Sequence, residues 1–497
     1  MRSNLSATDM RELVVGVEET VTLLDGSTRP YINFDNASST PFLRPVLDRV
    51  NDFAPMYASV GRGSGYKSHI STEAFDAARV TIGRFVGAGQ DTHAVILGKN
   101  TTEALNRAAH CLRLSKDDVV LTSLMEHHSN DLPWRKAAEV HQIGLCEDGT
   151  LDMSQLLESL HRFGSRVRLV AVTGASNVTG LVNPIHDIAK IVHDAGALIA
   201  VDAAQLAPHR AIDVGEPDDP RRIDFLACTG HKMYAPLGIG ALVALRSAIR
   251  AVEPELVGGG TVAFVTSEDV VWSGLPAREE AGTPNVLGAI GWAQAIDTLR
   301  AIGMDRIAEH ETELAEQMRA ALRDRPGIHL FGDSEVSRGK DRLGVIGFAI
   351  DGVSHGLAAA ILGYEGGIGV RTGLFCAHPY VQHLLGMTRD ASRSIVERLR
   401  SGEHQEMPGL IRASFGIYNT LEEVDAFVEV LDRIRSGGHA GKYVRNPSSG
   451  ALEPSVGCTW SGLGDSASAD RCCPWPASAG STESGRFNRA DGSLGDT

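Results

Sequence analysis

Lys232 is the residue of this chain that is best placed for covalent chemistry. It follows an apolar run, residues 224–228, and a short Thr229-Gly230-His231 turn, and a glycine-rich apolar run comes after it. An amine at the end of a buried strand can form a Schiff base with an aldehyde, and the polar groups of such a turn can bind a phosphate. Taken alone, Lys232 would equally be an exposed lysine beside a turn, so the chemistry needs a partner group.

A carboxylate at the end of another apolar run supplies that partner. Asp202 closes the run 197–202, and Gln205 follows it. A carboxylate held against a pyridine nitrogen keeps the ring protonated, and the ring then withdraws electrons from a bond that breaks at an amino-acid Cα. An aspartate at a strand end is by itself more often a helix cap or a turn former. Together with Lys232 it predicts a site for pyridoxal phosphate (PLP), with Gln205 at the phenolic oxygen of the cofactor.

Three further segments carry groups that suit the same cofactor. Thr101 and Thr102 begin a predicted helix, where hydroxyl and free N–H groups favour an anion such as a phosphate. His127 follows a predicted strand, and its imidazole can stack on a pyridine ring or move protons. Asn177 follows another strand and offers an amide to the cofactor or to a substrate carboxylate. Alone, these segments would be an N-cap, a pair of surface histidines and a turn.

The composition is that of a globular protein and excludes several classes. The 497 residues are 43% hydrophobic and 22% charged, with a net charge of -15. This acidity without a basic stripe argues against nucleic-acid binding. We find no apolar stretch of membrane-spanning length and no charged-then-apolar leader, and therefore expect a cytoplasmic protein. The seven cysteines lack metal-ligand spacing, so we expect neither a disulfide framework nor a metal site.

Short apolar runs that alternate with helical periodicity predict an α/β fold. The expected strands are 119–122, 167–173, 197–202 and 224–228, and the expected helices are 72–87 and 184–195. This alternation is typical of a mostly parallel sheet with helices on both faces, and such sheets bind ligands beyond the carboxyl ends of their strands. Asp202 and the turn that carries Lys232 both lie at such ends.

We expect four parts along the chain. They are an N-terminal segment (1–30), a large PLP-binding domain (31–290), a smaller α+β C-terminal domain (291–437) that also receives part of the N-terminal segment, and a disordered Gly/Ser-rich tail (438–497). Within the C-terminal half, the expected elements are a long helical stretch at 287–322, strands at 343–351, 367–372 and 410–418, and a closing helix at 421–434.

Seven separated motifs support the cofactor prediction. They lie at residues 126–130, 176–180, 201–205, 229–232, 280–285, 371–377 and 412–419. Their order resembles that of class V, fold-type I PLP enzymes, and the chain looks most like the group II cysteine desulfurases and selenocysteine lyases. The resemblance covers roughly residues 30 to 437, and agreement of several motifs in order is far more specific than one motif alone.

The resemblance implies a role for each matched residue. Lys232 would form the aldimine, Asp202 would pair with the pyridinium nitrogen, and His127 would stack on the ring and take part in catalysis. The cofactor contacts would be completed by Thr101, Thr102, Asn177, Gln205, Thr229 and His231, and by Thr283 from the second subunit of a homodimer. The substrate carboxylate would be bound by Asn177, Arg371 and Arg412, with Arg412 in a bidentate pair. Cys376 matches the nucleophile that takes sulfur from the substrate as a persulfide.

The implied activity is removal of sulfur or selenium from L-cysteine or a related amino acid, with a sulfur-acceptor protein as a candidate partner. Some features depart from the desulfurase pattern: Phe375 stands where those enzymes commonly have histidine, the stretch 377–409 is longer, and the segment 60–68 lacks their histidine pattern. They leave open a class V aminotransferase, epimerase or C–S lyase of a specialised biosynthetic pathway, in which Cys376 is not the nucleophile. A non-catalytic binding protein would not need Lys232, Asp202 and Arg412 together.

Overall fold

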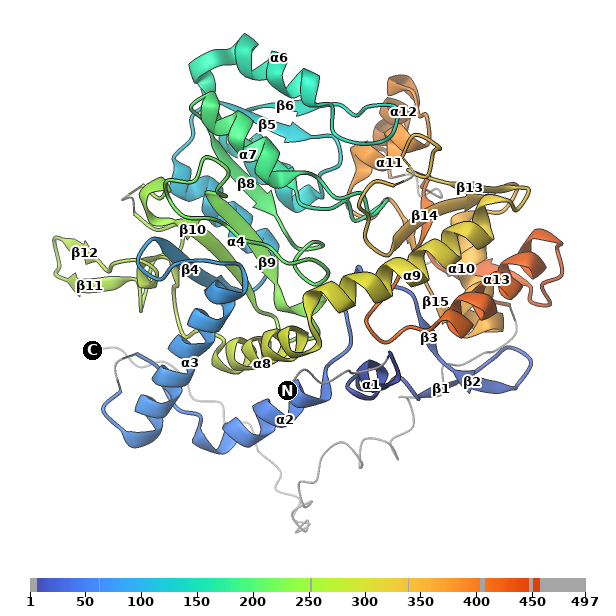
Figure 1. The fold of residues 1–497 in the computed structure, drawn as a ribbon, viewed down its shortest axis with the longest axis horizontal. Helices are drawn as coiled ribbons and strands as arrows, with labels where there is room; N and C mark the ends of the chain where they lie inside the picture. The colour runs from blue at the N-terminus through green and yellow to red at the C-terminus, as the bar shows by residue number, and fades with distance from the viewer. Residues whose placement is uncertain are drawn as a thin grey trace, which may run out of the picture.

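A seven-stranded sheet forms the centre of the larger domain in the computed structural model, which describes residues 7–61, 63–250, 253–337, 339–402, 407–446 and 450–455. The strand order is β4-β10-β9-β8-β7-β5-β6 (Figure 1). The strands are β4 (His93–Gly98), β5 (Val119–Ser123), β6 (Glu139–Ile143), β7 (Val167–Thr173), β8 (Leu198–Asp202), β9 (Phe225–Thr229) and β10 (Gly240–Leu245). Strand β10 runs antiparallel to its two neighbours, whereas β6, β5, β7, β8 and β9 pair in parallel. The predicted α/β class and its four strands are therefore confirmed.

Helices cover both faces of this sheet because side chains alternate along each strand. One face packs against α3 (Tyr66–Phe85), α6 (Met153–Phe163), α7 (Ile185–Asp194) and α8 (Val286–Ile302). The other face packs against α4 (Thr101–Leu112) and α5 (Leu132–Ala137). On that second face the central strands present Ala171, Ala200 and Ala227, whose small side chains leave room for α4 close to the sheet. The start of α4 is thereby brought to the carboxyl edge of the sheet.

Three of the predicted helices match the structure in position, including the closing helix expected at 421–434, and the prediction for a fourth helix was wrong. Helix α7 lies within the expected range 184–195, and α3 begins six residues before the expected start at 72. The single helical stretch expected at 287–322 is instead two helices, α8 and α9 (Met304–Arg323). Gly303 separates them with a φ of +99°, a conformation that glycine adopts without a steric penalty. The boundary between the domains at residue 290 stays a prediction, and α8 packs on α2 (Arg44–Phe53) and α3.

The C-terminal half holds a four-stranded sheet of order β13-β14-β17-β16. Its strands are β13 (Ile328–Leu330), β14 (Val345–Ile350), β16 (Arg371–Gly373) and β17 (Leu410–Ser414), and it packs with α9, α10 (His355–Gly366) and α13 (Leu421–Arg435). The strand expected at 367–372 proved to be two short strands in different sheets, because β15 (Ile368–Gly369) pairs with β3 (Ile32–Asn33) and β16 pairs with β17. The long stretch 377–409 contains α11 (His378–Leu384) and α12 (Arg389–Arg400).

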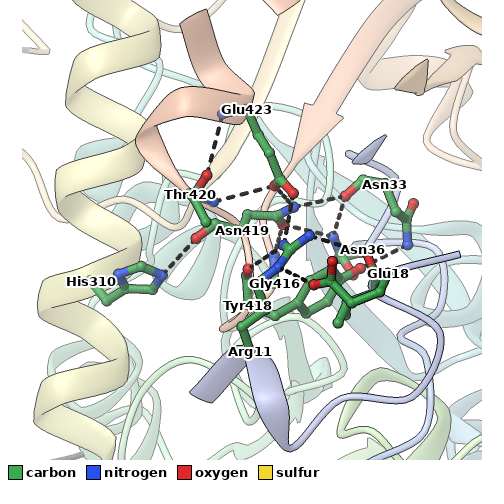
Figure 2. A network of polar contacts seen from close by, with 11 residues as sticks. Arg11, Glu18, Asn33, Asn36, His310, Gly416, Tyr418, Asn419, Thr420 and Glu423 are labelled. Carbon is green, nitrogen blue, oxygen red and sulfur yellow. Dashed lines mark hydrogen bonds and ion pairs between the residues drawn. The ribbon is translucent and has the colours of Figure 1, made fainter. Parts of the chain in front are cut away.

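The N-terminal segment is tied to the C-terminal half by a polar network (Figure 2). Arg11, in α1 (Ala7–Glu12), pairs with Glu423 at 2.8 Å between Nη1 and Oε1. Tyr418 donates to Asn36 Oδ1 at 2.8 Å and accepts from Asn33 Nδ2 at 2.9 Å. These bonds fix residues 33–36 beside β17, and the following residues lead directly into the cavity described below.

The described residues after α13 include a hairpin. Strands β18 (Tyr443–Arg445) and β19 (Leu452–Pro454) pair in an antiparallel manner, and the disordered tail expected from residue 438 onward stays a prediction. Residues 447–449 and 456–497 of that predicted tail lie outside the described residues. None of the helices in the described ranges has the length and apolar character required to cross a membrane.

The network of Figure 2 predicts a difference between two neighbouring glutamates. Glu423 forms a capping box with Thr420 and pairs with Arg11, whereas Glu422 is exposed on the same turn. We expect Glu423→Ala to lower the free energy of unfolding by about 2 kcal/mol, because it removes part of the capping box and leaves Arg11 with Glu18 as its remaining carboxylate partner. Urea denaturation followed by circular dichroism measures the loss. Glu422→Ala is the matched control, and an equal loss in both variants would contradict this account.

Candidate active site

A cavity of roughly 260 Å³ opens at the carboxyl edge of the large sheet. The predicted site residues that line it are Thr101, Thr102, His127, Asn177, Asp202, Gln205, Thr229, His231, Lys232, Arg371, Cys376 and Arg412. Thr283 is exposed and is not among the lining residues. Phe375 also lines the cavity, together with residues that the sequence analysis had not singled out, namely Ala37, Ser38, Asn100, Ser129, Thr173 and Ala204.

Lys232 and Asp202 reach this cavity from adjacent parallel strands. Lys232 ends a 3-10 turn, η4 (Gly230–Lys232), directly after β9, and Asp202 is the last residue of β8. Burial lowers the pKa of Lys232 to about 8, against the opposing effect of the Asp202 carboxylate. Burial likewise raises the pKa of Asp202, while a hydrogen bond from the Ala204 N–H at 2.9 Å and the Lys232 charge act in the other direction. An amine that is readily neutralised thus faces the same cavity as a buried carboxylate.

His127 is held as a neutral ring. Its Nδ1 accepts a hydrogen bond from the Ser129 N–H at 3.1 Å, so the proton of the neutral imidazole resides on Nε2. Burial lowers the pKa of His127 to about 3, and burial together with the Lys232 charge lowers that of His231 to about 4. Both imidazoles are therefore uncharged at neutral pH and suited to contacts with a ring or a hydrogen-bond acceptor.

A buried carboxylate fixes the turn that carries His127. Glu126 accepts hydrogen bonds from Asn130 Nδ2 at 2.6 Å, from the Thr173 N–H at 2.9 Å and from the Ser123 hydroxyl. These donors come from η2 (His128–Asn130) and from the ends of β7 and β5. Burial raises the pKa of Glu126 to about 8. Glu126 therefore joins η2 to the ends of β5 and β7. It lies in the motif at residues 126–130, but the sequence does not indicate this structural role.

The start of α4 fits a phosphate group. Asn100 caps the helix by accepting from the Glu103 N–H at 3.0 Å, and Thr101 and Thr102 occupy its first turn, where N–H groups have no partner within the helix. The Thr101 hydroxyl oxygen is buried and has no hydrogen-bond partner within the described part of the chain. Thr102 bonds the Ser129 hydroxyl at 2.7 Å, and Thr229 donates to the Ile239 carbonyl at 3.1 Å. An unpartnered donor beside free N–H groups is what an anchored phosphate would satisfy.

Close approach of the backbone keeps this helix start in place. A Cβ on Gly240, the first residue of β10, would meet Asn100 Cα at 2.6 Å, so no larger residue fits there.

Gln205 donates through Nε2 to the Ala37 carbonyl at 2.8 Å, which leaves its carbonyl oxygen and second N–H for a ligand. The residues present therefore fit PLP at its phosphate end, at its ring nitrogen and along its phenolic edge.

Arg412 presents to the cavity a buried guanidinium, a group that can bind a carboxylate. It lies on β17, is 2% exposed, and donates through Nη1 to the Asn177 carbonyl at 2.9 Å. Its Nη2 bonds Asp35 Oδ1 at 3.0 Å and the Ser38 hydroxyl at 2.7 Å, whereas its buried Nε lacks a partner among the described residues. Arg371 stands 3.8 Å from the second oxygen of Asp35. Asp35 and Ser38 were missed because only their small-polar setting, Asp35 to Thr40, marks them in the sequence.

Cys376 reaches the cavity on the turn between β16 and α11. Its thiol is free and exposed, and its carbonyl accepts from the His128 N–H at 2.7 Å. The preceding residue, Phe375, lies over the guanidinium of Arg412. One cavity therefore contains an amine, an arginine with an open donor and a thiol, which is the set needed to bind an amino acid and attack its side chain.

The lowered pKa of Lys232 predicts the pH dependence of cofactor loading. Only the neutral amine attacks an aldehyde, so the rate at which cofactor-free protein incorporates PLP should rise up to about pH 8 and level off above it. Absorbance of the covalent product after mixing measures this rate. Asp202→Asn should shift the midpoint downward, because the carboxylate raises the Lys232 pKa, and Lys232→Ala should form no covalent product. A midpoint near the ordinary lysine value, about 10.4, would contradict the buried-amine account.

Comparisons with known proteins agree with this geometry. The sequence matches the aminotransferase class-V family over residues 32–427. It is 35% identical to a cysteine desulfurase of Haloferax volcanii over 422 residues, which cover 83% of this chain and 91% of that protein. It is 33% identical to a probable cysteine desulfurase of Streptomyces coelicolor over 426 residues, covering 83% of this chain and 93% of that one.

Solved structures give the same result. The apo cysteine desulfurase of Thermococcus onnurineus superposes with a TM-score of 0.71 at 31% identity, covering 82% of this chain and 95% of that one. The cysteine desulfurase CsdA of Escherichia coli gives 0.70 at 29% identity, covering 86% and 98%. The resemblance found in the motifs is confirmed: the chain belongs to the class-V aminotransferase family and is an enzyme that uses pyridoxal phosphate.

Proposed function

We propose that this enzyme is a cysteine desulfurase that converts L-cysteine to L-alanine and takes up the sulfur on Cys376. The observation that carries the proposal is the position of the exposed Cys376 thiol in the same cavity as Lys232 and Arg412. The two relatives named above are called a cysteine desulfurase and a probable cysteine desulfurase, and the similarity covers 91% and 93% of their lengths. A related amino acid, including the selenium analogue, fits the same contacts.

Arg412 and Asn177 bind the substrate. The Nε–H of Arg412 has no acceptor among the residues that the structure describes, so a carboxylate can accept from it together with one Nη–H, and the Asn177 amide adds a further donor. Arg371, more exposed at the rim, adds positive charge that attracts the carboxylate. With the carboxylate fixed there, Lys232 is placed to remove the proton from the substrate Cα as a neutral amine.

PLP, when bound, supplies an aldehyde carbon to which amines attach and a ring that delocalises the electron pair left at Cα. Thr101, Thr102, Thr229 and His231 would hold its phosphate, while Asp202 would pair with its ring nitrogen. His127 would cover one ring face, and Gln205 would contact the phenolic oxygen. The buried position of Asp202 makes that pairing strong, because opposite charges attract more in a medium of low dielectric constant.

Cys376 carries out the sulfur step. Its thiolate attacks the substrate sulfur, so that an S–S bond forms while the Cβ–S bond breaks, and the electron pair of that bond remains on the substrate carbon. Protons delivered to that carbon skeleton yield L-alanine, and the enzyme keeps the sulfur as a Cys376 persulfide. The net change is L-cysteine plus a thiol giving L-alanine plus a persulfide, which balances without an external oxidant.

Two cysteine variants test this function. Cys376→Ala in the PLP-loaded enzyme should lose L-cysteine-dependent formation of alanine and persulfide by at least about 10²-fold, because the acceptor of the sulfur is gone. Cys146 is also exposed but lies away from this cavity, so Cys146→Ala should retain full activity. Alanine and sulfide are quantified after addition of a reductant that releases sulfide from the Cys376 persulfide.

The outcomes separate the candidate functions. Equal sulfide release without the Cys376 thiol would replace the desulfurase by a direct C–S lyase. An absence of sulfide from every form, combined with turnover of other amino acids, would favour a class V aminotransferase or epimerase of a biosynthetic pathway.

We further propose that the enzyme is a homodimer in which Thr283 reaches the neighbouring site. The hairpin of β11 (Val262–Val265) and β12 (Val270–Trp272) projects from the body as an arm (Figure 1). Phe264, Val265 and Val271 on this hairpin are exposed apolar residues. A bond from the Gly282 N–H to the Gly259 carbonyl at 2.7 Å joins the stretch with Thr283 to the base of the arm. An apolar arm of this kind supports burial against a second copy.

The arm gives a prediction about assembly. Val271→Glu should convert the dimer to monomers and weaken PLP binding, because it places a charge in the apolar contact and removes Thr283 from the partner's phosphate site. Analytical ultracentrifugation measures the first effect and PLP titration the second. Val336→Glu is the control, since Val336 is 64% exposed on the C-terminal half. A dimer that tolerates Val271→Glu would remove the arm from the interface.

The exposed thiol also supports transfer of sulfur to an acceptor protein, since a persulfide on Cys376 is open to attack from outside the cavity. Free thiols at Cys111, Cys146, Cys228 and Cys376 suit a reducing compartment, and we propose the cytoplasm as the location.

A further inference from the structure

The turn that carries Cys376 has an unusual backbone. Phe375 and Cys376 both have left-handed conformations, with φ values of +49° and +53°. Two adjacent non-glycine residues in this region store strain and persist only when surrounding contacts hold them. The contacts that hold this pair therefore decide where the thiol lies.

Two of these contacts act on the backbone. The His128 N–H donates to the Cys376 carbonyl at 2.7 Å, and Asn177 Nδ2 donates to the Phe375 carbonyl at 2.8 Å. Leu374 and Phe375 also pack into an apolar cluster with Met125, Val178 and Tyr380. The turn is thus fixed to the large domain through η2 and through the loop after β7.

A third contact acts on Arg412. The Phe375 ring is 8% exposed, and its centroid lies 5.0 Å from the guanidinium carbon of Arg412. The edges of that guanidinium are held by the Asn177 carbonyl, Asp35 and Ser38, so the ring covers a face that these partners leave open. A cation over an aromatic face is attracted to it, and the attraction grows when both groups are removed from water.

Asn177 and Arg412, which we propose as the residues that bind the substrate carboxylate, therefore also hold the turn that carries the Cys376 thiol. We propose that Phe375 is a positioning residue that couples the carboxylate site to Cys376, by clamping the strained turn against the face of Arg412. The inference rests on the proposed function for the sulfur-accepting role of Cys376 and for the binding of the substrate carboxylate by Asn177 and Arg412.

A double-mutant cycle on the reactivity of Cys376 tests the coupling. The PLP-loaded enzyme is treated with iodoacetamide, and alkylation of the Cys376 peptide is followed by mass spectrometry, which needs no turnover. Phe375→Leu removes the aromatic face but keeps apolar volume, and Arg412→Lys removes the planar face but keeps the charge. Each single variant should speed alkylation about fivefold, which corresponds to roughly 1 kcal/mol, because the strained turn relaxes once its clamp is lost.

The double variant should react no faster than either single variant, because both remove the same contact. Phe375→Tyr keeps an aromatic ring, so its Cys376 should be alkylated at the wild-type rate. Leu374 lies in the same apolar cluster, and Leu374→Ala should show no coupling to Arg412. In steady-state kinetics Phe375→Leu should raise KM for L-cysteine about tenfold, which corresponds to about 1.4 kcal/mol. The change in kcat should be smaller. Multiplicative effects in the double variant, or a Phe375→Tyr enzyme that behaves like Phe375→Leu, would overturn the proposal.

Loss of the proposed function has a different signature. If no variant and no wild-type enzyme releases sulfur from L-cysteine, the desulfurase assignment fails. The alkylation cycle still decides whether Phe375 and Arg412 are coupled.

Discussion

The attraction between a buried amine and a buried carboxylate is the interaction on which the site depends. Lys232 and Asp202 lie at the ends of β9 and β8, which pair in parallel, so their side chains are delivered to one edge of the sheet. Burial pushes both groups toward their neutral forms, and each opposes that effect on the other. A cofactor that carries a positive ring nitrogen and an aldehyde would satisfy both residues, since its nitrogen meets the carboxylate and its aldehyde takes the neutral amine.

Support for this pair lies deeper in the large domain. Thr173, the last residue of β7, is aligned with Asp202 in the parallel register, and its N–H donates to the buried Glu126. Through Asn130 the same carboxylate holds the turn that carries His127. A buried carboxyl group with several donors is costly to place and rigid once satisfied, so it keeps the histidine aligned with the sheet edge.

The substrate side of the cavity is assembled from parts that are remote in the sequence. Arg412 comes from β17, Asp35 from the stretch after β3, and Asn177 from the loop after β7. A buried guanidinium requires partners for its donors, and three segments must meet before they are supplied. Docking of the N-terminal segment through Arg11 and Tyr418 therefore supports the surroundings of Arg412, which we propose as the binding group for the substrate carboxylate (Figure 2).

The sequence by itself determined the parallel sheet and the groups at its carboxyl edge. Apolar runs that end in Asp202 or lead to Lys232 are local patterns, and the topology of parallel strands then requires their ends to meet. Only the tertiary structure decided the break of the helix at Gly303, the split of residues 367–372 between two sheets, and the contacts of Asp35 and Phe375 with Arg412. These features depend on register and packing between segments up to several hundred residues apart, and a local pattern of residue types carries no information about such distances.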